Sequence, residues 1–363
     1  MTTRHRSPTD GSPAAPVRVD VVGRTDVGRT REHNEDSFLV ADLTTGRMLP
    51  DNGVDNYPAG ERGLLFAVAD GMGGAAAGEI ASDMAVQSLM ETLCERWTAA
   101  EVASTPEGFA QALREATEAA NERIHLFALQ HPEYRGMGTT ATIAGLLGDT
   151  LYLAQVGDSR AYLVRGGEAL QLTKDQSLMQ QLVEAGEITP EEAERSERRN
   201  IILQALGPES TVAIDLTDQP VRRGDVLLLC SDGLSSIVGK QDIARAVQEE
   251  PDLDAVCRRL IAQANESGGP DNITVVAARL VGEALREPSV GDTVGYHSYG
   301  SLTPATRDPG QREQPSQPAQ PVPPQIVRPA PVVPRREGQK WVAVLGGLAV
   351  LLALYTLWRF VRP

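Results

Sequence analysis

The chain has 363 residues, with 49 acidic and 34 basic side chains and a formal net charge of -15 at pH 7. This length allows one large domain with tails, or two domains, and the acidic balance argues against nucleic acid as the main partner. The three cysteines, Cys94, Cys230 and Cys257, are scattered without CxxC spacing. This distribution argues against a disulfide framework and fits a reducing compartment.

The N-terminal region contains an arm, a strand and a charged loop. Residues 1–16 are polar and lack the apolar run of a secretory signal, so we expect a disordered arm. Residues 17–22 alternate apolar and polar positions, which predicts a strand. The loop that follows places Arg31 five residues before Asp36, next to Glu35. Such a loop is usually only a solvated connection, but here a cation and a carboxylate pair could share one site.

An apolar run that ends in a glycine-rich turn follows at residues 64–78. Its first six residues have the length and bulk of a buried strand, and Asp70 stands where that strand should end. Gly71, Gly73 and Gly74 allow a sharp turn and a close approach of the backbone to a bound group. A carboxylate beside bare backbone suits a hard metal ion, which takes carboxylate and carbonyl oxygens. Taken alone, these residues are at least as typical of an Asp-Gly turn.

The middle of the chain changes from helical to strand periodicity. Residues 79–97 and a segment that begins near residue 105 carry apolar positions at helical spacing. Four short apolar runs then predict an antiparallel meander. These runs are residues 139–147, 151–156, 161–165 and 169–172. Asp158 follows the second run and is again next to a glycine.

The last third of the predicted domain begins with polar residues. Residues 174–206 predict two helical pieces, and the charged stretch 191–199 is typical of a solvated face, although it could also be a flap that contacts substrate. Residues 226–229 and 273–280 read as buried strands. Helices are expected between these strands, at residues 240–249 and 253–264.

Carboxylates therefore recur in one setting. An apolar strand ends at, or just before, an aspartate next to a glycine at Asp70, Asp158 and Asp232, and Asp271 immediately precedes a strand. Each aspartate alone is more typical of a turn. Adjacent strands in one or two sheets would place all four along one edge, where clustered carboxylates are tolerated when cations neutralise them. Together with the acidic pair at residues 35–36, the pattern favours a site for several metal ions.

Six short motifs occur in order along residues 19–280. They are Arg31 with Glu35-Asp36, Ala69-Asp70-Gly71-Met72-Gly73-Gly74, Gly138-Thr139-Thr140, Gly157-Asp158-Ser159-Arg160, Ser231-Asp232-Gly233 and Asp271-Asn272-Ile273-Thr274. Each motif alone is weak, but the ordered set is highly specific. It resembles the metal-dependent protein phosphatase family, type 2C, and most of all the bacterial serine/threonine members that partner transmembrane kinases.

This resemblance implies a fold and a metal centre. The fold would be an α+β, four-layer α/β/β/α sandwich, with two antiparallel β-sheets flanked by helices and the metals at one edge. Asp70 would bridge two Mn²⁺ or Mg²⁺ ions, and the Gly71 carbonyl would bind one of them. Asp232 and Asp271 would hold the first ion, and Glu35 and Asp36 would hold the second, directly or through water. Asp158, together with Asp232, would hold a third ion, as in bacterial relatives. Arg31 would bind the substrate phosphate.

These assignments agree with elementary chemistry. Two ions about 3.5–4 Å apart lower the pKa of a bridging water and clamp the oxygens of an in-line displacement. Water then attacks phosphorus directly, so no serine or cysteine nucleophile is required. No cysteine has an arginine six positions later, which excludes a cysteine-dependent phosphatase loop. The guanidinium of Arg31 matches the geometry of a phosphate.

Two positions depart from the family's pattern. Some members carry a histidine two residues after the bridging aspartate, proposed to protonate the leaving alkoxide, and here that position is Met72. The general acid is therefore unassigned, and metal-bound water is our hypothesis. Bacterial relatives often have a histidine where this chain has Gln176, a change that affects no expected metal ligand.

The C-terminal region changes character. Residues 283–340 are rich in Pro and lack periodicity, so we expect a disordered linker. Residues 341–358 carry no charge, have tryptophans at both ends and are flanked by basic residues. This pattern predicts a transmembrane helix at residues 341–361. A buried core helix is the alternative, and the linker that separates this segment from the only core argues against it.

The sequence therefore predicts a single-pass protein of the cell membrane, with a cytoplasmic serine/threonine phosphoprotein phosphatase domain at residues 17–282. Its partners would be phosphorylated proteins, among them a serine/threonine kinase and its substrates, together with the membrane. One alternative is a catalytically inactive binding module of the same fold, against which the presence of every expected ligand argues. Another is a phosphatase for small phosphorylated molecules or for a sigma-factor antagonist, which substitutions in residues 191–199 would test.

Overall fold

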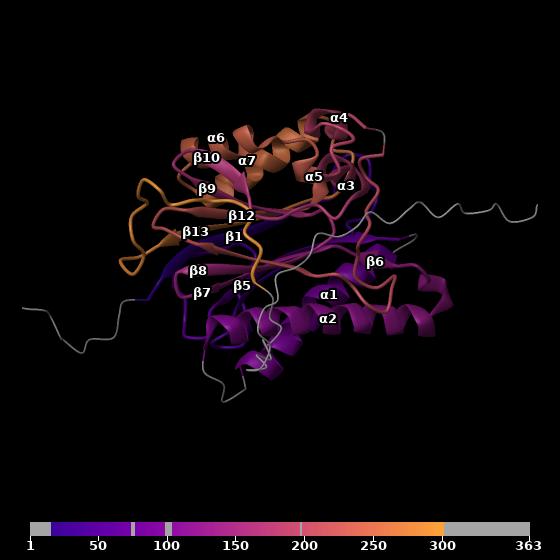
Figure 1. The fold of residues 1–363 in the computed structure, drawn as a ribbon, viewed down its shortest axis with the longest axis horizontal. Coiled ribbons are helices and arrows are strands. Elements are labelled where there is room, and N and C mark those ends of the chain that lie inside the picture. The colour runs from indigo at the N-terminus through magenta and orange to yellow at the C-terminus, as the bar shows by residue number, and fades with distance from the viewer. Residues whose placement is uncertain (1–15, 74–76, 99–103, 197, 301–363) are drawn as a thin grey trace, which may run out of the picture. The chain divides into compact units, whose positions relative to one another are not determined.

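Two β-sheets pack face to face, and helices cover the outer face of each sheet (Figure 1). The computed structural model describes residues 16–73, 77–98, 104–196 and 198–300. Every pairing between the strands of the two sheets in these ranges is antiparallel. The predicted α/β/β/α sandwich with two antiparallel sheets is therefore confirmed.

The strands of the described residues form one sheet of six strands and one of seven. The first sheet has the spatial order β10-β9-β12-β13-β1-β4 and the second β11-β8-β7-β5-β2-β3, with β6 paired to β5 beside that path. In the first sheet the strands are β1 (Arg18–Asp26), β4 (Val54–Pro58), β9 (Arg160–Arg165), β10 (Glu168–Gln171), β12 (Val226–Cys230) and β13 (Ile273–Val281). In the second they are β2 (Asp36–Asp42), β3 (Arg47–Met48), β5 (Leu64–Met72), β6 (Gly138–Thr139), β7 (Ala141–Leu147), β8 (Thr150–Val156) and β11 (Asp215–Pro220).

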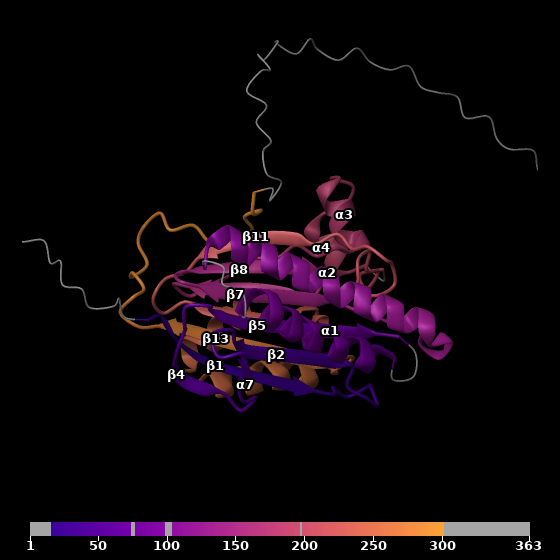
Figure 2. The ribbon, with the colours of Figure 1, turned by 90° about the horizontal axis from the view of Figure 1, so that it is seen from below.

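The helices fall into three groups. Against the second sheet lie α1 (Ala77–Leu93), its π-helical end η1 (Cys94–Thr98) and α2 (Pro106–Gln130), which a 3-10 turn, η2 (Pro132–Tyr134), follows. Against the first sheet lie α5 (Asp232–Ser235), α6 (Lys240–Glu249) and α7 (Leu253–Glu266). The short helices α3 (Leu178–Glu184) and α4 (Pro190–Glu194) stand beside the sandwich (Figure 2).

Strand β5 is apolar throughout because both of its faces are covered. Successive side chains of a strand point to opposite faces. Leu65 and Ala67 therefore pack under α1, whereas Phe66 and Val68 pack between the two sheets. The continuous apolar run that the sequence shows at this position is the signature of a strand inside a layered core. The same alternation directs Asp70 toward the space between the sheets, at the end of the inter-sheet core.

Helix α2 begins and packs as its sequence predicts. Thr105 precedes it, and its hydroxyl accepts a hydrogen bond from the Gly108 amide at 3.1 Å, while Pro106 occupies the first turn. The predicted apolar stripe is buried; it consists of Phe109, Leu113, Ala116, Ala120 and Ile124. Glycine at position 145 of β7 makes room for this stripe, because a Cβ there would lie 2.5 Å from the Phe109 ring.

The region between β2 and β5 contains the two edge strands β3 and β4. Both strands are short and largely exposed, so they show no apolar periodicity from which they could be recognised. Strand β11 also lacked a sequence signal, because it is a polar edge strand next to β8.

The folded unit extends past the predicted boundary at residue 282. Residues 283–300, expected to belong to a disordered linker, run back along the domain and pair with β11 through a bridge between Thr217 and Ser298. Leu285, in this segment, is buried in the inter-sheet core. The rest of the predicted linker, the predicted span at residues 341–361 and residues 1–15 of the predicted arm lie outside the described residues. Within residues 16–300, apart from the gaps named above, no helix is long and apolar enough to cross a membrane.

Removal of the Phe66 ring tests the inter-sheet core. Phe66 is fully buried between the sheets, and we expect Phe66→Ala to lower the free energy of unfolding by about 3–5 kcal/mol, because it loses apolar burial and leaves a cavity. Urea unfolding of the metal-free protein measures this loss. Met48→Ala, at a side chain that is 60% exposed, is the control and should change stability by less than about 0.5 kcal/mol. Equal effects at the two positions would contradict the layered core.

Candidate metal centre

Asp36 and Asp70 are direct neighbours across β2 and β5. The two strands pair antiparallel, with Asp36 opposite Asp70 in register. Cross-strand partners present their side chains on the same face of a sheet, and here that face looks toward the other sheet. The Ser231 hydroxyl, at the end of β12 in that other sheet, donates to Asp36 Oδ2 at 2.7 Å. The first two carboxylates therefore lie where the edges of the two sheets meet.

The remaining aspartates come from loops at the same edge. One residue separates Asp232, which opens α5, from the end of β12, and one residue separates Asp271 from the start of β13, the strand that pairs with β12. Asp158 follows β8 and is 6% exposed. Burial is the largest cause that raises the pKa of Asp70, and the charges of Asp36, Asp232, Asp158 and Asp271 add to it. The structure thus brings together the four aspartates that sequence spacing assigned to one edge.

Glu35 and Arg31 reach the same place from the charged loop before β2. The Arg31 guanidinium donates to Asp271 Oδ2 at 2.8 Å and lies 4.0 Å from Glu35 Oε2. The hydrogen bond to Asp271 raises the pKa of Arg31. With 47% of its side chain exposed, Arg31 is accessible to a phosphate from solvent. Arg31 therefore lies beside Asp271 and beside Glu35, the first residue of the acidic pair.

Glycines let the backbone of three segments approach closely. The Gly71 amide donates to the Glu35 carbonyl at 3.0 Å. A Cβ at Gly71 would lie 2.1 Å from the Gly78 carbonyl oxygen, and a Cβ at Gly78 would lie 2.7 Å from Glu35 Cδ. Any side chain at residue 71 or 78 would therefore push α1 away from the acidic loop. The close approach that the glycine-rich sequence implied is a real packing constraint.

Two polar residues tie the site together, and sequence reasoning gave them no role. The side-chain nitrogen of Asn272, Nδ2, donates to the carbonyls of Val27 and His33 at 3.0 and 2.9 Å. The side-chain oxygen Oδ1 accepts from the backbone amide of Glu35 at 2.8 Å. Asn272 thereby holds the charged loop against β13. The Thr140 hydroxyl accepts from the Asp70 amide at 3.0 Å and bonds to the Ser159 hydroxyl at 2.8 Å. The available signal was that each residue belongs to one of the six ordered motifs, Gly138-Thr139-Thr140 and Asp271-Asn272-Ile273-Thr274.

Burial makes the free carboxylates resist ionisation. Desolvation is the largest cause of the raised pKa values of Asp36 and Asp158, each about 7, and the Asp232 charge adds to both. Burial also raises the pKa of Asp70 well above its usual range, and that of Asp232, on which Asp271 acts as well. Nearby cations would lower these pKa values, because they favour the ionised carboxylate.

The donor set fits hard divalent cations. The converging groups are carboxylates and the Gly71 backbone, with no histidine or cysteine among them, and oxygen ligands are those that Mg²⁺ and Mn²⁺ prefer. Asp36 Oδ1 and Asp158 Oδ1 are buried without a hydrogen-bond partner, so each has a free position for a ligand bond. Among the residues described, no three acidic, histidine or cysteine side chains already converge in metal-ligand geometry. Asp271 Oδ2 instead accepts a hydrogen bond from Arg31.

A cleft of about 650 Å³ opens beside Asp158 and Asp232. Helices α3 and α4 form one wall, and α5 with the loop that follows it forms another. Arg195 and Arg199, from the charged stretch predicted as a solvated face or a substrate-contacting flap, line this cleft. Their position favours the second interpretation, because a cleft next to the carboxylates with basic residues on its wall suits an anionic ligand.

Comparison with known proteins identifies relatives over most of the chain. The sequence pattern of the family described as Protein phosphatase 2C matches residues 55–281. The serine/threonine phosphatase stp of Listeria welshimeri is 38% identical over 253 residues, which are 70% of this chain and 92% of that protein. The serine/threonine protein phosphatase PstP of Mycobacterium tuberculosis is 40% identical over 259 residues, 71% of this chain and 44% of that protein.

Solved structures share the fold. The crystal structure of the Mycobacterium tuberculosis phosphatase PstP/Ppp has a TM-score of 0.61 at 37% identity, over 73% of this chain and 100% of that one. A structure of the PstP catalytic domain in complex with two manganese ions has a TM-score of 0.59 at 37% identity, again over 73% and 100% of the two chains. The structure of the S. agalactiae serine/threonine phosphatase has a TM-score of 0.63 at 34% identity, over 73% of this chain and 100% of that one.

The pH dependence of the stability of the metal-free protein tests the cost of burying these carboxyl groups in their ionised form. Between the ordinary carboxyl pKa of 3.8 and the folded value of about 7 for Asp36 and Asp158, the folded state binds more protons than the unfolded state. The free energy of unfolding should therefore fall as pH rises through this window. Thermal unfolding in EDTA from pH 4 to pH 8 measures it, and Asp36→Asn should weaken the dependence. The exposed Asp55→Asn is the matched control and should leave the slope unchanged; an unchanged slope in Asp36→Asn would contradict the assignment.

Proposed function

The chain belongs to the protein phosphatase 2C family, and on this basis we propose that it hydrolyses phosphoserine and phosphothreonine in proteins with Mn²⁺ or Mg²⁺ bound at the Asp70 edge. The observation that carries the proposal is the convergence of Asp36, Asp70, Asp232 and Asp271 next to Arg31. A hydrolase that activates water for attack on a phosphate monoester can use bound cations to offset the charge of its substrate, and this acidic edge can hold them.

Individual ligand roles are part of the proposal. Asp70 would bridge two ions, with the Gly71 carbonyl on one of them. Asp232 and Asp271 would complete the first position, and Glu35 and Asp36 the second. Asp158, with Asp232, would serve a third ion; its buried and unpartnered Oδ1 supports that role.

The chain's own residues bind and orient the substrate. When bound, two divalent ions lower the pKa of a water molecule and neutralise the phosphoryl oxygens. Arg31 presents a half-exposed, fork-shaped guanidinium to the phosphate. Occupation of Asp271 by cations would free Arg31 from its present ion pair. The Cys230 thiol is buried, its pKa is raised to about 12 by that burial, and it stays protonated at neutral pH, so it is no candidate nucleophile.

Partners and location form a second part of the proposal. We propose that the substrates include a serine/threonine kinase and its targets, and that residues 341–361 anchor the protein in the cell membrane with the catalytic domain in the cytoplasm. The support is the uncharged stretch 341–358, its basic flanks and its terminal tryptophans. The cysteines agree with a reducing compartment, because all three are free thiols.

Asp70→Asn tests the catalytic part of the proposal. Release of phosphate from a phosphothreonine peptide by the full-length protein should require Mn²⁺ and stop in EDTA. Removal of a group that hydrogen-bonds a metal ligand lowers metal affinity or activity by about 10–100-fold. Asp70→Asn changes a proposed bridging ligand itself, so it should lower kcat/KM by at least about 100-fold. Asp55→Asn, an exposed carboxylate of the same type, should behave as wild type. Turnover that persists in EDTA would sink the metal mechanism, whereas peptide binding without turnover would favour the inactive binding module.

Two arginines in the middle of the uncharged stretch test the anchor. Val350→Arg with Leu351→Arg should move the full-length protein from the membrane fraction to the soluble fraction, since each arginine at the centre of a span costs about 2.5–3.5 kcal/mol. Sedimentation of membranes followed by carbonate extraction measures the distribution. Val350→Leu with Leu351→Val keeps the apolar character and should stay with the membranes. Recovery of the wild-type protein in the soluble fraction would contradict the anchor.

A further inference from the structure

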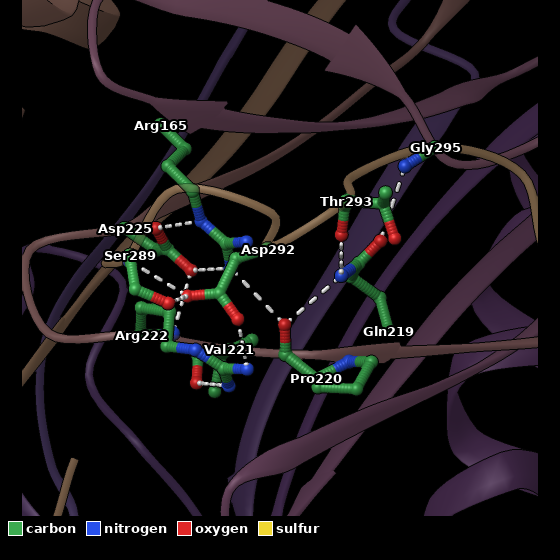
Figure 3. A network of polar contacts seen from close by, with 10 residues as sticks. All are labelled: Arg165, Gln219, Pro220, Val221, Arg222, Asp225, Ser289, Asp292, Thr293 and Gly295. Carbon is green, nitrogen blue, oxygen red and sulfur yellow. Dashed lines mark hydrogen bonds and ion pairs between the residues drawn. The ribbon is translucent and has the colours of Figure 1, made fainter. Parts of the chain in front are cut away.

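The segment after β13 is held firmly on the domain. We call residues 283–300 the strap. Arg222 anchors its middle: the guanidinium donates to Asp292 Oδ1, while the Ser289 amide donates to Asp292 Oδ2 at 2.8 Å (Figure 3). Arg222 is itself fixed, because its amide donates to Asp225 Oδ2 at 2.7 Å. The exposed fractions of the Arg222 and Asp292 side chains are only 8% and 12%, so this ion pair is shielded from solvent.

The strap then follows the edge of the second sheet. Gln219 bonds to it twice, donating to the Thr293 carbonyl and accepting from the Gly295 amide, both at 3.1 Å (Figure 3). The Tyr299 amide donates to the Leu216 carbonyl at 2.8 Å. The Gln219 side chain thus satisfies two backbone groups of the strap. The Tyr299 amide in turn satisfies a backbone carbonyl of β11, which would otherwise remain open on an edge strand.

Tyr296 of the strap contacts Asp215, at the start of β11, and Lys174, which precedes α3. Its hydroxyl donates to Asp215 Oδ1 at 3.0 Å. Its ring lies under the Lys174 ammonium, with Lys174 Nζ 4.3 Å from the ring centroid. Lys174 also pairs with Glu184 Oε1 at 3.3 Å, and Glu184 ends α3. Contacts thus run without a gap from the strap to the helix that walls the cleft.

Helix α3 is held mainly by polar contacts at its ends. At its start the Leu178 amide donates to the Ile201 carbonyl at 2.9 Å, and Ser177 forms a β-bridge with Ile202. Met179 is its only buried residue. Three of its side chains, Met179, Gln180 and Val183, line the cleft beside Asp158. A wall with so small an apolar anchor depends on the few polar contacts made at its ends. Lys174, which contacts both the strap and Glu184, makes one of them.

We propose that Tyr296 and Lys174 are positioning residues for peptide substrates, acting by holding the α3 wall of the cleft in place. This proposal rests on the proposed phosphatase function. The reacting phosphate binds at the carboxylate edge, whereas the residues that flank it in a peptide extend along the cleft. Displacement of α3 therefore weakens peptide binding and leaves the chemical step unchanged.

The test separates a peptide from a small phosphate ester. Full-length protein with Mn²⁺ is assayed on a phosphothreonine peptide and on p-nitrophenyl phosphate. Tyr296→Ala and Lys174→Met should each raise KM for the peptide about two- to fivefold, the range expected for one exposed cation–π contact. The value of kcat for the peptide and kcat/KM for p-nitrophenyl phosphate should not change. The double variant should match either single variant, because both act through one contact.

Two further variants keep the outcome decisive. Tyr296→Phe retains the ring beneath Lys174 and should keep the wild-type KM. Glu287→Gln removes an ion pair between the strap and Arg223, away from Lys174, and should also behave as wild type. An unchanged peptide KM in Tyr296→Ala would overturn the proposal, as would additive effects in the double variant or equal loss on both substrates with a lower melting temperature. Failure of the wild-type protein to hydrolyse either substrate would instead contradict the proposed function.

Discussion

The mutual repulsion of buried carboxylates at one sheet edge is the constraint on which the rest of this structure depends. Asp36, Asp70, Asp158 and Asp232 all resist ionisation there, because burial removes solvation and each charge opposes its neighbours. Such an arrangement costs folding free energy when it is charged and empty. The apolar packing of the sandwich must offset this cost. Cations that bind only the folded state stabilise it further.

A two-sheet sandwich suits this task. The carboxylates come from the ends of strands in both sheets, so the packing between the sheets sets the distances among them. Hydrogen bonds of Asn272 and Thr140 then fix the loops to those strand ends. Side chains on a rigid framework need little rearrangement when a substrate arrives, which is the condition for electrostatic stabilisation of a transferred phosphoryl group.

The substrate side of the site is built on the opposite principle. Helices α3 and α4 stand beside the sandwich with little apolar burial, and short polar contacts with the strap and with Lys174 fix one end of α3. Low local burial leaves a segment free to adjust at small cost in free energy. On our proposal, a fixed metal edge next to an adjustable wall would allow one chemical step to serve phosphate groups in differing peptide surroundings.

The sequence by itself determined the main layers and pointed to the carboxylates that share one edge. Continuous apolar runs next to Asp-Gly predicted β5 and β12, helical stripes predicted α1 and α2, and the repeated aspartates predicted a shared edge, because local periodicity and turn chemistry depend on neighbouring residues. Only the tertiary structure decided the edge strands β3, β4 and β11, the bonds of Asn272 and the course of the strap. These features depend on partners far away in the chain: Asn272 lies 237 residues from Glu35, and Asp292 lies 70 from Arg222. A polar segment carries no periodic signal of its own, so its structure is set by the distant groups that satisfy its hydrogen bonds and charges.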